Sequence, residues 1–159
     1  MHSLPKIDPF PNSLFMSDTV VTVHTGNVAF ESDIEGYKVR MDAAPEFGGT
    51  GFGPRPKPLV LSALAGCAGI DVASIMRKKH VPYKSFRIIT TGETVETHPK
   101  YYHKIHLVFE VTGENFEGDD SVYEKVARAV ELSSETYCGV NAMLKRSAEI
   151  THEIRLVNG

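Results

Sequence analysis

Two cysteines, Cys67 and Cys138, are the residues of this chain with the most distinctive chemistry. A thiol that reduces a peroxide needs a thiolate, a neighbouring cation or hydrogen-bond donor, and a way to discharge the sulfenic acid that it forms. A second cysteine nearby supplies the last requirement by condensing with the first into a disulfide. The two cysteines are far apart in sequence and match neither a CxxC motif nor a metal-knuckle spacing, so the pair works only if the fold brings it together.

The local context of each cysteine leaves two interpretations open. Cys67 lies in a run of small residues, Ala-Gly-Cys-Ala-Gly, where a free cysteine often packs as a small apolar side chain. Cys138 precedes a short predicted helix, whose dipole predicts a lowered thiol pKa. Asp71 follows Cys67 by one helical turn, and an ionised carboxylate there would raise the pKa of a neighbouring thiol.

Other classes of site have no support in the sequence. His103 and His106 point to opposite faces of a predicted strand and the other histidines are isolated, so we predict no metal site. No G-x-S-x-G motif is present, and Gly48–Gly53 (GGTGFG) fits neither phosphate-binding glycine pattern. The formal net charge of -3, without a basic stripe, argues against nucleic acid as a partner.

The elements that must position the cysteines follow from apolar periodicity and turn residues. A helix from Leu59 to about Lys79, with Pro58 as its first residue, is apolar nearly all round, which predicts burial in a core or an interface. A second helix is predicted from a capping box, S-x-x-E, that begins at Ser121, and its helical spacing is given by Val122, Val126, Ala129, Val130 and Ser133. Around these we predict strands at Asp18–His24, Val28–Ser32, Tyr37–Asp42, Phe86–Thr97, Tyr101–Thr112 and Thr151–Val157, a glycine- and proline-rich loop at Ala43–Pro56, and a short helix at Val140–Arg146.

The first three strands are expected to form a meander, and Phe86–Thr97 and Tyr101–Thr112 a hairpin. Alternation along the second of these predicts one buried face, with His103, Ile105, Leu107, Phe109 and Val111.

The order of these elements predicts an α+β protein with two sheet-plus-helix halves that share one core. Residues 17–159 are expected to form a single domain, and Met1–Met16, with three prolines and no apolar h-region, an N-terminal arm or disordered tail. No stretch approaches the length of a transmembrane helix: the apolar run Leu59–Ile70 is too short and ends at Asp71, so we expect no membrane association. We predict a cytoplasmic protein with reduced thiols.

Two segments carry a resemblance to a known family. Pro56-Lys57-Pro58-Leu59 followed by Leu64-Ala65-Gly66-Cys67-Ala68, and later Leu132-Ser133-Ser134-Glu135-Thr136-Tyr137-Cys138, resemble the OsmC/Ohr superfamily. The segments Gly66–Val72 and Ala129–Ser133 are particularly similar to OsmC-like proteins of the YhfA type. The resemblance covers roughly Val20 to Val157.

The resemblance implies an OsmC-like fold in an intertwined homodimer with buried central helices. It implies thiol-dependent reduction of organic hydroperoxides in defence against oxidative stress, with no bound cofactor. Cys67 would attack the hydroperoxide, Cys138 would resolve the sulfenic acid as a disulfide, and a dithiol reductant would restore the pair. The alternative is a weak or inactive OsmC-like dimer that binds a small hydrophobic ligand.

The charged residues of the family pattern are matched only in part. Peroxidases of the family carry a glutamate directly after a proline at the start of the cysteine helix, where this chain has Lys57. They also carry an arginine in the early hairpin, and residues 31–36 contain none. Glu46 resembles another acidic family position and is the third candidate catalytic residue. Arg40, Arg55 or Lys57 could supply a cation, and the spacing selects none of them.

Overall fold

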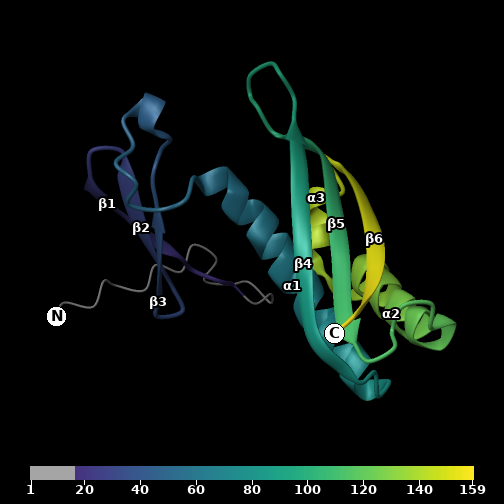
Figure 1. The fold of residues 1–159 in the computed structure, drawn as a ribbon. Helices are drawn as coiled ribbons and strands as arrows, with labels where there is room; N and C mark the ends of the chain where they lie inside the picture. Colours follow the sequence, from purple (N-terminus) through teal and green to yellow (C-terminus); the bar gives the residue numbers. More distant parts are fainter. Residues whose placement is uncertain (1–16) are drawn as a thin grey trace. The chain divides into compact units, whose positions relative to one another are not determined.

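A computed structural model of the chain describes residues 17–159, which form a mixed α+β fold with two three-stranded sheets (Figure 1). The predicted fold class is thereby confirmed. The contacts divide the chain into two units, which meet in sequence at Leu59 and Val60 and are described separately. The arm or tail predicted for Met1–Met16 lies outside the described residues.

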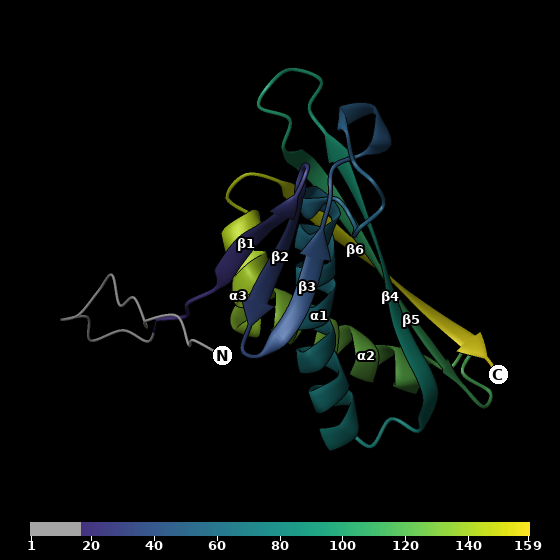
Figure 2. The same ribbon diagram turned by 90° about the vertical axis from the view of Figure 1, so that its left-hand side faces the viewer.

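Unit 1 contains the predicted meander. The strands β1 (Val21–Gly26), β2 (Ala29–Ile34) and β3 (Tyr37–Met41) pair antiparallel in that order (Figure 2). Tight turns join them, as the turn residues between the predicted strands indicate. The prediction of three short strands is confirmed, with boundaries that differ by a few residues.

The glycine-rich loop after β3 is held in place by Asp42, which is only 2% exposed. Its carboxylate accepts hydrogen bonds from the backbone N–H groups of Ala43 at 2.8 Å, Thr50 at 2.8 Å and Phe52 at 3.0 Å. A Cβ on Gly49 would lie 1.9 Å from the Ala43 carbonyl oxygen, so position 49 has no room for a side chain and requires glycine. The loop is therefore an ordered structure built around one buried carboxylate.

We expect Asp42→Asn to loosen this loop. The hydrogen bonds from Phe52 and Thr50 hold the pKa of Asp42 below its usual range, and their contribution outweighs the opposing effect of burial. A carboxyl whose pKa is lowered by folding stabilises the protein above its unfolded pKa of about 3.9 and loses that contribution as the pH falls through the folded pKa. Amide hydrogen exchange at Thr50 and Phe52 should accelerate in the variant at neutral pH, and the native protein should lose the same protection in acid. Asp18→Asn, an exposed control in this unit, should change neither, and equal protection in Asp42→Asn and native protein would contradict the prediction.

The cysteine helix α1 (Pro56–Lys78) begins two residues before the predicted first residue, Pro58. Within one chain only a single stripe of it is buried, at positions four residues apart: Leu64, Ala68, Val72 and Met76. The side chain of Ile70 is 73% exposed. Leu61, Cys67 and Ile75 are partly buried against the same core, whereas Val60 and Ile70 are exposed in the single chain.

By length and composition α1 is also long and apolar enough to cross a membrane, and an 18-residue stretch of it has a mean hydropathy of 1.9. The expectation that no stretch approaches that length is wrong, because the helix continues through Asp71 to Lys78. A core helix meets the same criterion, and the buried stripe of α1 belongs to the core of unit 2. One such helix is weak evidence for a membrane span.

Unit 2 is built on a second sheet in the order β4 (Tyr83–Thr94), β5 (Tyr102–Gly113) and β6 (Glu149–Asn158). The strands β4 and β5 form the predicted hairpin, whereas β6 pairs parallel to β5 at the sheet edge. Helices α1, α2 (Asp120–Leu132) and α3 (Gly139–Leu144) lie against one face of this sheet (Figure 1). Four of the five residues predicted on the buried face of β5 are buried, Ile105, Leu107, Phe109 and Val111, whereas His103 near the start of the strand is only half-buried.

The start of α2 differs from the predicted capping box. The N-cap is Asp119, whose carboxylate accepts a hydrogen bond from the Val122 N–H at 3.0 Å. Aspartate caps a helix as well as serine does, and it stands two residues before Ser121. The buried spacing predicted for this helix is confirmed by Val122, Val126, Ala129, Val130 and Ser133.

Candidate functional site

The fold brings Cys67 and Cys138 together from separate elements of unit 2. Cys67 lies near the middle of α1 and is half-buried, whereas Cys138 caps the N-terminus of α3 and is 3% exposed. Both are free thiols; Cys138 belongs to the buried core of unit 2, and Cys67 packs against that core. The Cys138 sulfur also accepts a hydrogen bond from the Asn141 N–H at 3.3 Å. Two segments that are distant in sequence therefore form one site.

The pKa of Cys138 is raised to about 11, contrary to the lowering predicted from the helix N-terminus. Burial is the largest cause, because it penalises the thiolate. The hydrogen bond to Cys67 and the negative charges of Cys67 and Asp71 act in the same direction. The Asn141 N–H acts against them and is outweighed. At neutral pH Cys138 is therefore a protonated thiol.

A five-residue π turn, Ser133–Tyr137, leads from α2 to Cys138. The Cys138 N–H donates to the Ser133 carbonyl oxygen at 2.9 Å, and the Asn141 side-chain amide donates to the Ser134 carbonyl oxygen at 2.7 Å. The Ser133 hydroxyl donates to Asp71 Oδ2 on α1 at 3.1 Å. These bonds fix the turn at both ends. The apolar spacing of α2 already places Ser133 on the buried face, but no sequence pattern indicates its partner.

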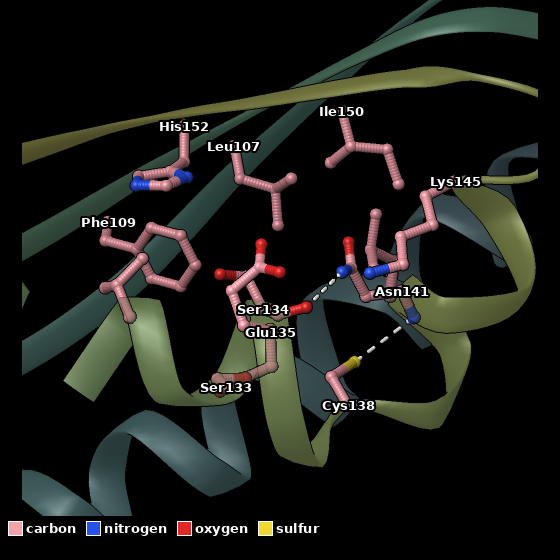
Figure 3. Close-up of a pocket in the computed structure, with 13 residues that line it drawn as sticks. Leu107, Phe109, Ser133, Ser134, Glu135, Cys138, Asn141, Lys145, Ile150 and His152 are labelled. Carbon is pink, nitrogen blue, oxygen red and sulfur yellow. Dashed lines mark hydrogen bonds between the residues drawn. The ribbon is translucent and has the colours of Figure 1, made fainter. Parts of the chain in front are cut away.

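A cavity of about 160 Å³ opens beside Cys138. Figure 3 shows that the sheet supplies one wall of it, whereas the π turn and α3 supply the opposite wall (Figure 3). Three ionisable side chains, Glu135, Lys145 and His152, join Cys138 in the lining. The remaining lining is mainly apolar and includes Leu64, Leu107, Phe109, Val130 and Ile150.

The other predicted site residues lie in unit 1. Glu46 is exposed within a short 3₁₀ turn, Pro45–Phe47, whereas both cysteines belong to unit 2. Arg40 forms an ion pair with Glu31, Nε to Oε2 at 3.3 Å, and its guanidinium lies 4.8 Å from the ring centre of Phe52. A role for Glu46 or for a unit 1 cation at the cysteine pair stays a prediction.

Metal-ligating side chains do not gather in the part of the chain that the structure describes. Within residues 17–159 no three His, Cys, Asp or Glu side chains are grouped so that they could hold a metal ion.

Comparison with known proteins identifies the fold family. The family model described as OsmC-like protein matches residues 48–153, which contain both cysteines. No curated protein matches the chain. A solved structure from structural genomics is 30% identical, with a TM-score of 0.73 over 89% of this chain and 99% of that chain.

Two further solved structures are similar in fold. A hypothetical protein from Aquifex aeolicus VF5 is 27% identical, with a TM-score of 0.72 over 89% of this chain and 98% of its own. An organic hydroperoxide resistance protein OsmC from Legionella pneumophila is 16% identical, with a TM-score of 0.61 over 91% of this chain and 99% of its own, which shows similarity of fold alone. The match to the family model extends over most of the chain, and the chain therefore belongs to the OsmC-like protein family.

Proposed function

We propose that this protein reduces organic hydroperoxides with the Cys67–Cys138 thiol pair, as a cytoplasmic homodimer that contributes to defence against oxidative stress. The observation that carries the proposal is that two free thiols from distant segments meet at one core, close enough for Cys67 to act on the pKa of Cys138. Membership of the OsmC-like family supports the same chemistry. The Legionella pneumophila protein of this fold is described as an organic hydroperoxide resistance protein and a predicted redox protein.

The first step is assigned to Cys67. Cys138 is almost fully buried and protonated at neutral pH, so it is a poor initial nucleophile. The Cys67 thiolate attacks the terminal oxygen of the hydroperoxide; an S–O bond forms and the O–O bond breaks. The alkoxide leaves and takes a proton from water, which gives the alcohol and a Cys67 sulfenic acid. The sulfur is oxidised by two electrons and the hydroperoxide is reduced by two.

The second step is assigned to Cys138. Conversion of the Cys67 thiolate into a neutral sulfenic acid removes one negative charge that raises the pKa of Cys138, so the first step itself activates the second thiol. The Cys138 sulfur then attacks the Cys67 sulfur, an S–S bond forms, and the sulfenic oxygen leaves as water with the thiol proton. A dithiol reductant returns the disulfide to two thiols and becomes a disulfide itself.

The cavity beside Cys138 favours an apolar substrate. About half of its lining residues are aliphatic or aromatic, and these could hold the alkyl part of an organic hydroperoxide, for which hydrogen peroxide has no counterpart. The same observation favours the alternative function, in which the cavity of a weak or inactive dimer binds a small hydrophobic ligand. The two functions differ in what happens to the thiols.

Thiol titration of the native protein separates them. Treatment with cumene hydroperoxide, without reductant, is expected to remove both thiols of each chain. A non-reducing gel should show no covalent dimer, because the disulfide forms within one chain. Peptide mapping should recover Cys67 joined to Cys138. Two thiols that persist through the treatment would overturn the redox proposal and leave ligand binding as the function.

A further inference from the structure

Asp71 is a charged residue that the proposed reaction does not use, although it lies beside the cysteine pair. It follows Cys67 by one turn of α1 and is half-buried. Its carboxylate oxygen Oδ2 accepts the hydroxyl hydrogen of Ser133 at 3.1 Å, and Ser133 is 1% exposed. The second acceptor near that hydroxyl, the Ala68 carbonyl oxygen at 3.5 Å, also belongs to α1. A side-chain hydrogen bond thus joins the helix of Cys67 to the segment that carries Cys138.

The partner of Asp71 is the residue on which Cys138 itself depends. The Ser133 carbonyl oxygen accepts the hydrogen bond from the Cys138 N–H at 2.9 Å and closes the π turn. One residue therefore binds Asp71 through its side chain and Cys138 through its backbone. A shift of Ser133 along α1 would move Cys138 with respect to Cys67.

We propose that Asp71 is a positioning residue for the redox pair. Through its hydrogen bond to Ser133 it holds the π turn that places Cys138 beside Cys67, and its negative charge keeps Cys138 protonated until the second step. This inference rests on the proposed function. The charge of Asp71 is one of the causes that raise the pKa of Cys138, together with burial and Cys67. A thiol that stays protonated leaves the first attack to its neighbour, so the carboxylate keeps the two roles distinct.

The other ionisable groups around Cys138 come from each element packed against it. Cys67 and Asp71 face it from α1, Glu135 from the π turn, Lys145 from the end of α3 and His152 from β6. Of these, only Cys67 and Asp71 contribute to the raised pKa. A titration of Cys138 with Cys67 unchanged therefore reports on Asp71.

Two variants separate the charge of Asp71 from its hydrogen bond. Asp71→Asn keeps an oxygen that can accept from Ser133 but removes the charge, whereas Ser133→Ala removes the hydroxyl and keeps the charge. The rate of alkylation of Cys138 is followed from neutral to alkaline pH by mass spectrometry of its peptide. In Asp71→Asn we expect the midpoint to fall by about 0.3 pH unit, which means about twofold faster alkylation at neutral pH, because the charge of Asp71 is the smallest of the causes that raise the pKa of Cys138. In Ser133→Ala we expect slower formation of the Cys67–Cys138 disulfide after peroxide treatment, with a smaller change in the midpoint.

Matched controls exist within the same segment. The Ser134 hydroxyl donates only to the Glu131 carbonyl oxygen, so Ser134→Ala controls for the loss of a hydroxyl. Glu131 forms an exposed ion pair with Arg128, so Glu131→Gln controls for the loss of a negative charge. Neither should move the Cys138 midpoint.

Different measurements test the role of Asp71 and the reduction of hydroperoxide. An unchanged Cys138 midpoint in folded Asp71→Asn would overturn the inference, whatever the protein does with hydroperoxide. Resistance of the native thiols to hydroperoxide would overturn the function, whereas the alkylation midpoints would still report the charge of Asp71. If Asp71→Asn does not fold, Asp71→Glu replaces it, because glutamate keeps the charge and lengthens the side chain. This variant should retain the high midpoint of Cys138 and form the disulfide more slowly. A disulfide rate equal to that of the native protein would contradict the positioning role.

Discussion

Cys67→Ser is expected to abolish the consumption of organic hydroperoxide, by at least about 10³-fold, the scale on which enzymes lose activity with their covalent nucleophile. A serine hydroxyl is not ionised at neutral pH and cannot replace the thiolate. Cys138 cannot take over the attack, because its pKa of about 11 keeps it protonated and because it is 3% exposed. The measurement is cumene hydroperoxide consumption with a dithiol present, compared with native protein.

Cys138→Ser is the informative companion to this variant. It should still react with one equivalent of hydroperoxide, but the product should be a Cys67 sulfenic acid that a carbon nucleophile such as dimedone can trap. Native protein should yield the disulfide instead. Equal rates for Cys67→Ser and native protein would refute the assignment of Cys67, and a trapped sulfenic acid on Cys138 would reverse the two roles.

Phe116→Ala is expected to cost about 3–5 kcal/mol of the free energy of unfolding, the usual range for removal of a fully packed phenylalanine. Phe116 lies in the turn between β5 and α2, is 2% exposed, and belongs to the core of unit 2. A Cβ on Gly113 would come within 2.4 Å of its ring, so the ring lies directly over that glycine. Deletion of the ring would leave a void that the surrounding strands and helix cannot fill.

Chemical denaturation at a fixed protein concentration measures this cost. Tyr123→Ala removes an aromatic ring from the adjacent helix, where it is 46% exposed, and should cost much less. A similar loss for both variants would show that burial in the single chain does not govern the contribution of Phe116.

Elements with regular apolar spacing could be predicted from the sequence, because burial on one face leaves a periodic pattern. The meander, the β4–β5 hairpin and the buried positions of α2 are of this kind. Phe116 shows the limit: it lies in a turn, where no periodicity distinguishes a core residue from an exposed one. The parallel pairing of β6 with β5 has no local signal either, since it depends on the path of the connecting helices.

The site could be predicted in part. The cysteines and Asp71 could be selected because of the chemistry of their side chains, and the short helix after Cys138 could be predicted from the sequence around it. The direction of the Cys138 pKa shift could not be predicted, because the helix N-terminus is a local feature whereas burial and the approach of α1 arise from tertiary packing. Ser133 was visible only as a buried helix position; its bond to Asp71 depends on how α1 and the π turn meet.

The parallel pairing of β6 has a consequence for the order of synthesis. Both cysteine segments precede β6 in the chain, and β6 supplies Ile150 and His152 to the wall of the Cys138 cavity. A ribosome therefore produces both thiols before it produces the strand that encloses one of them. During that interval the nascent chain lacks part of the burial that raises the pKa of Cys138. The full rise in the pKa of Cys138 is thus acquired only when β6 is in place.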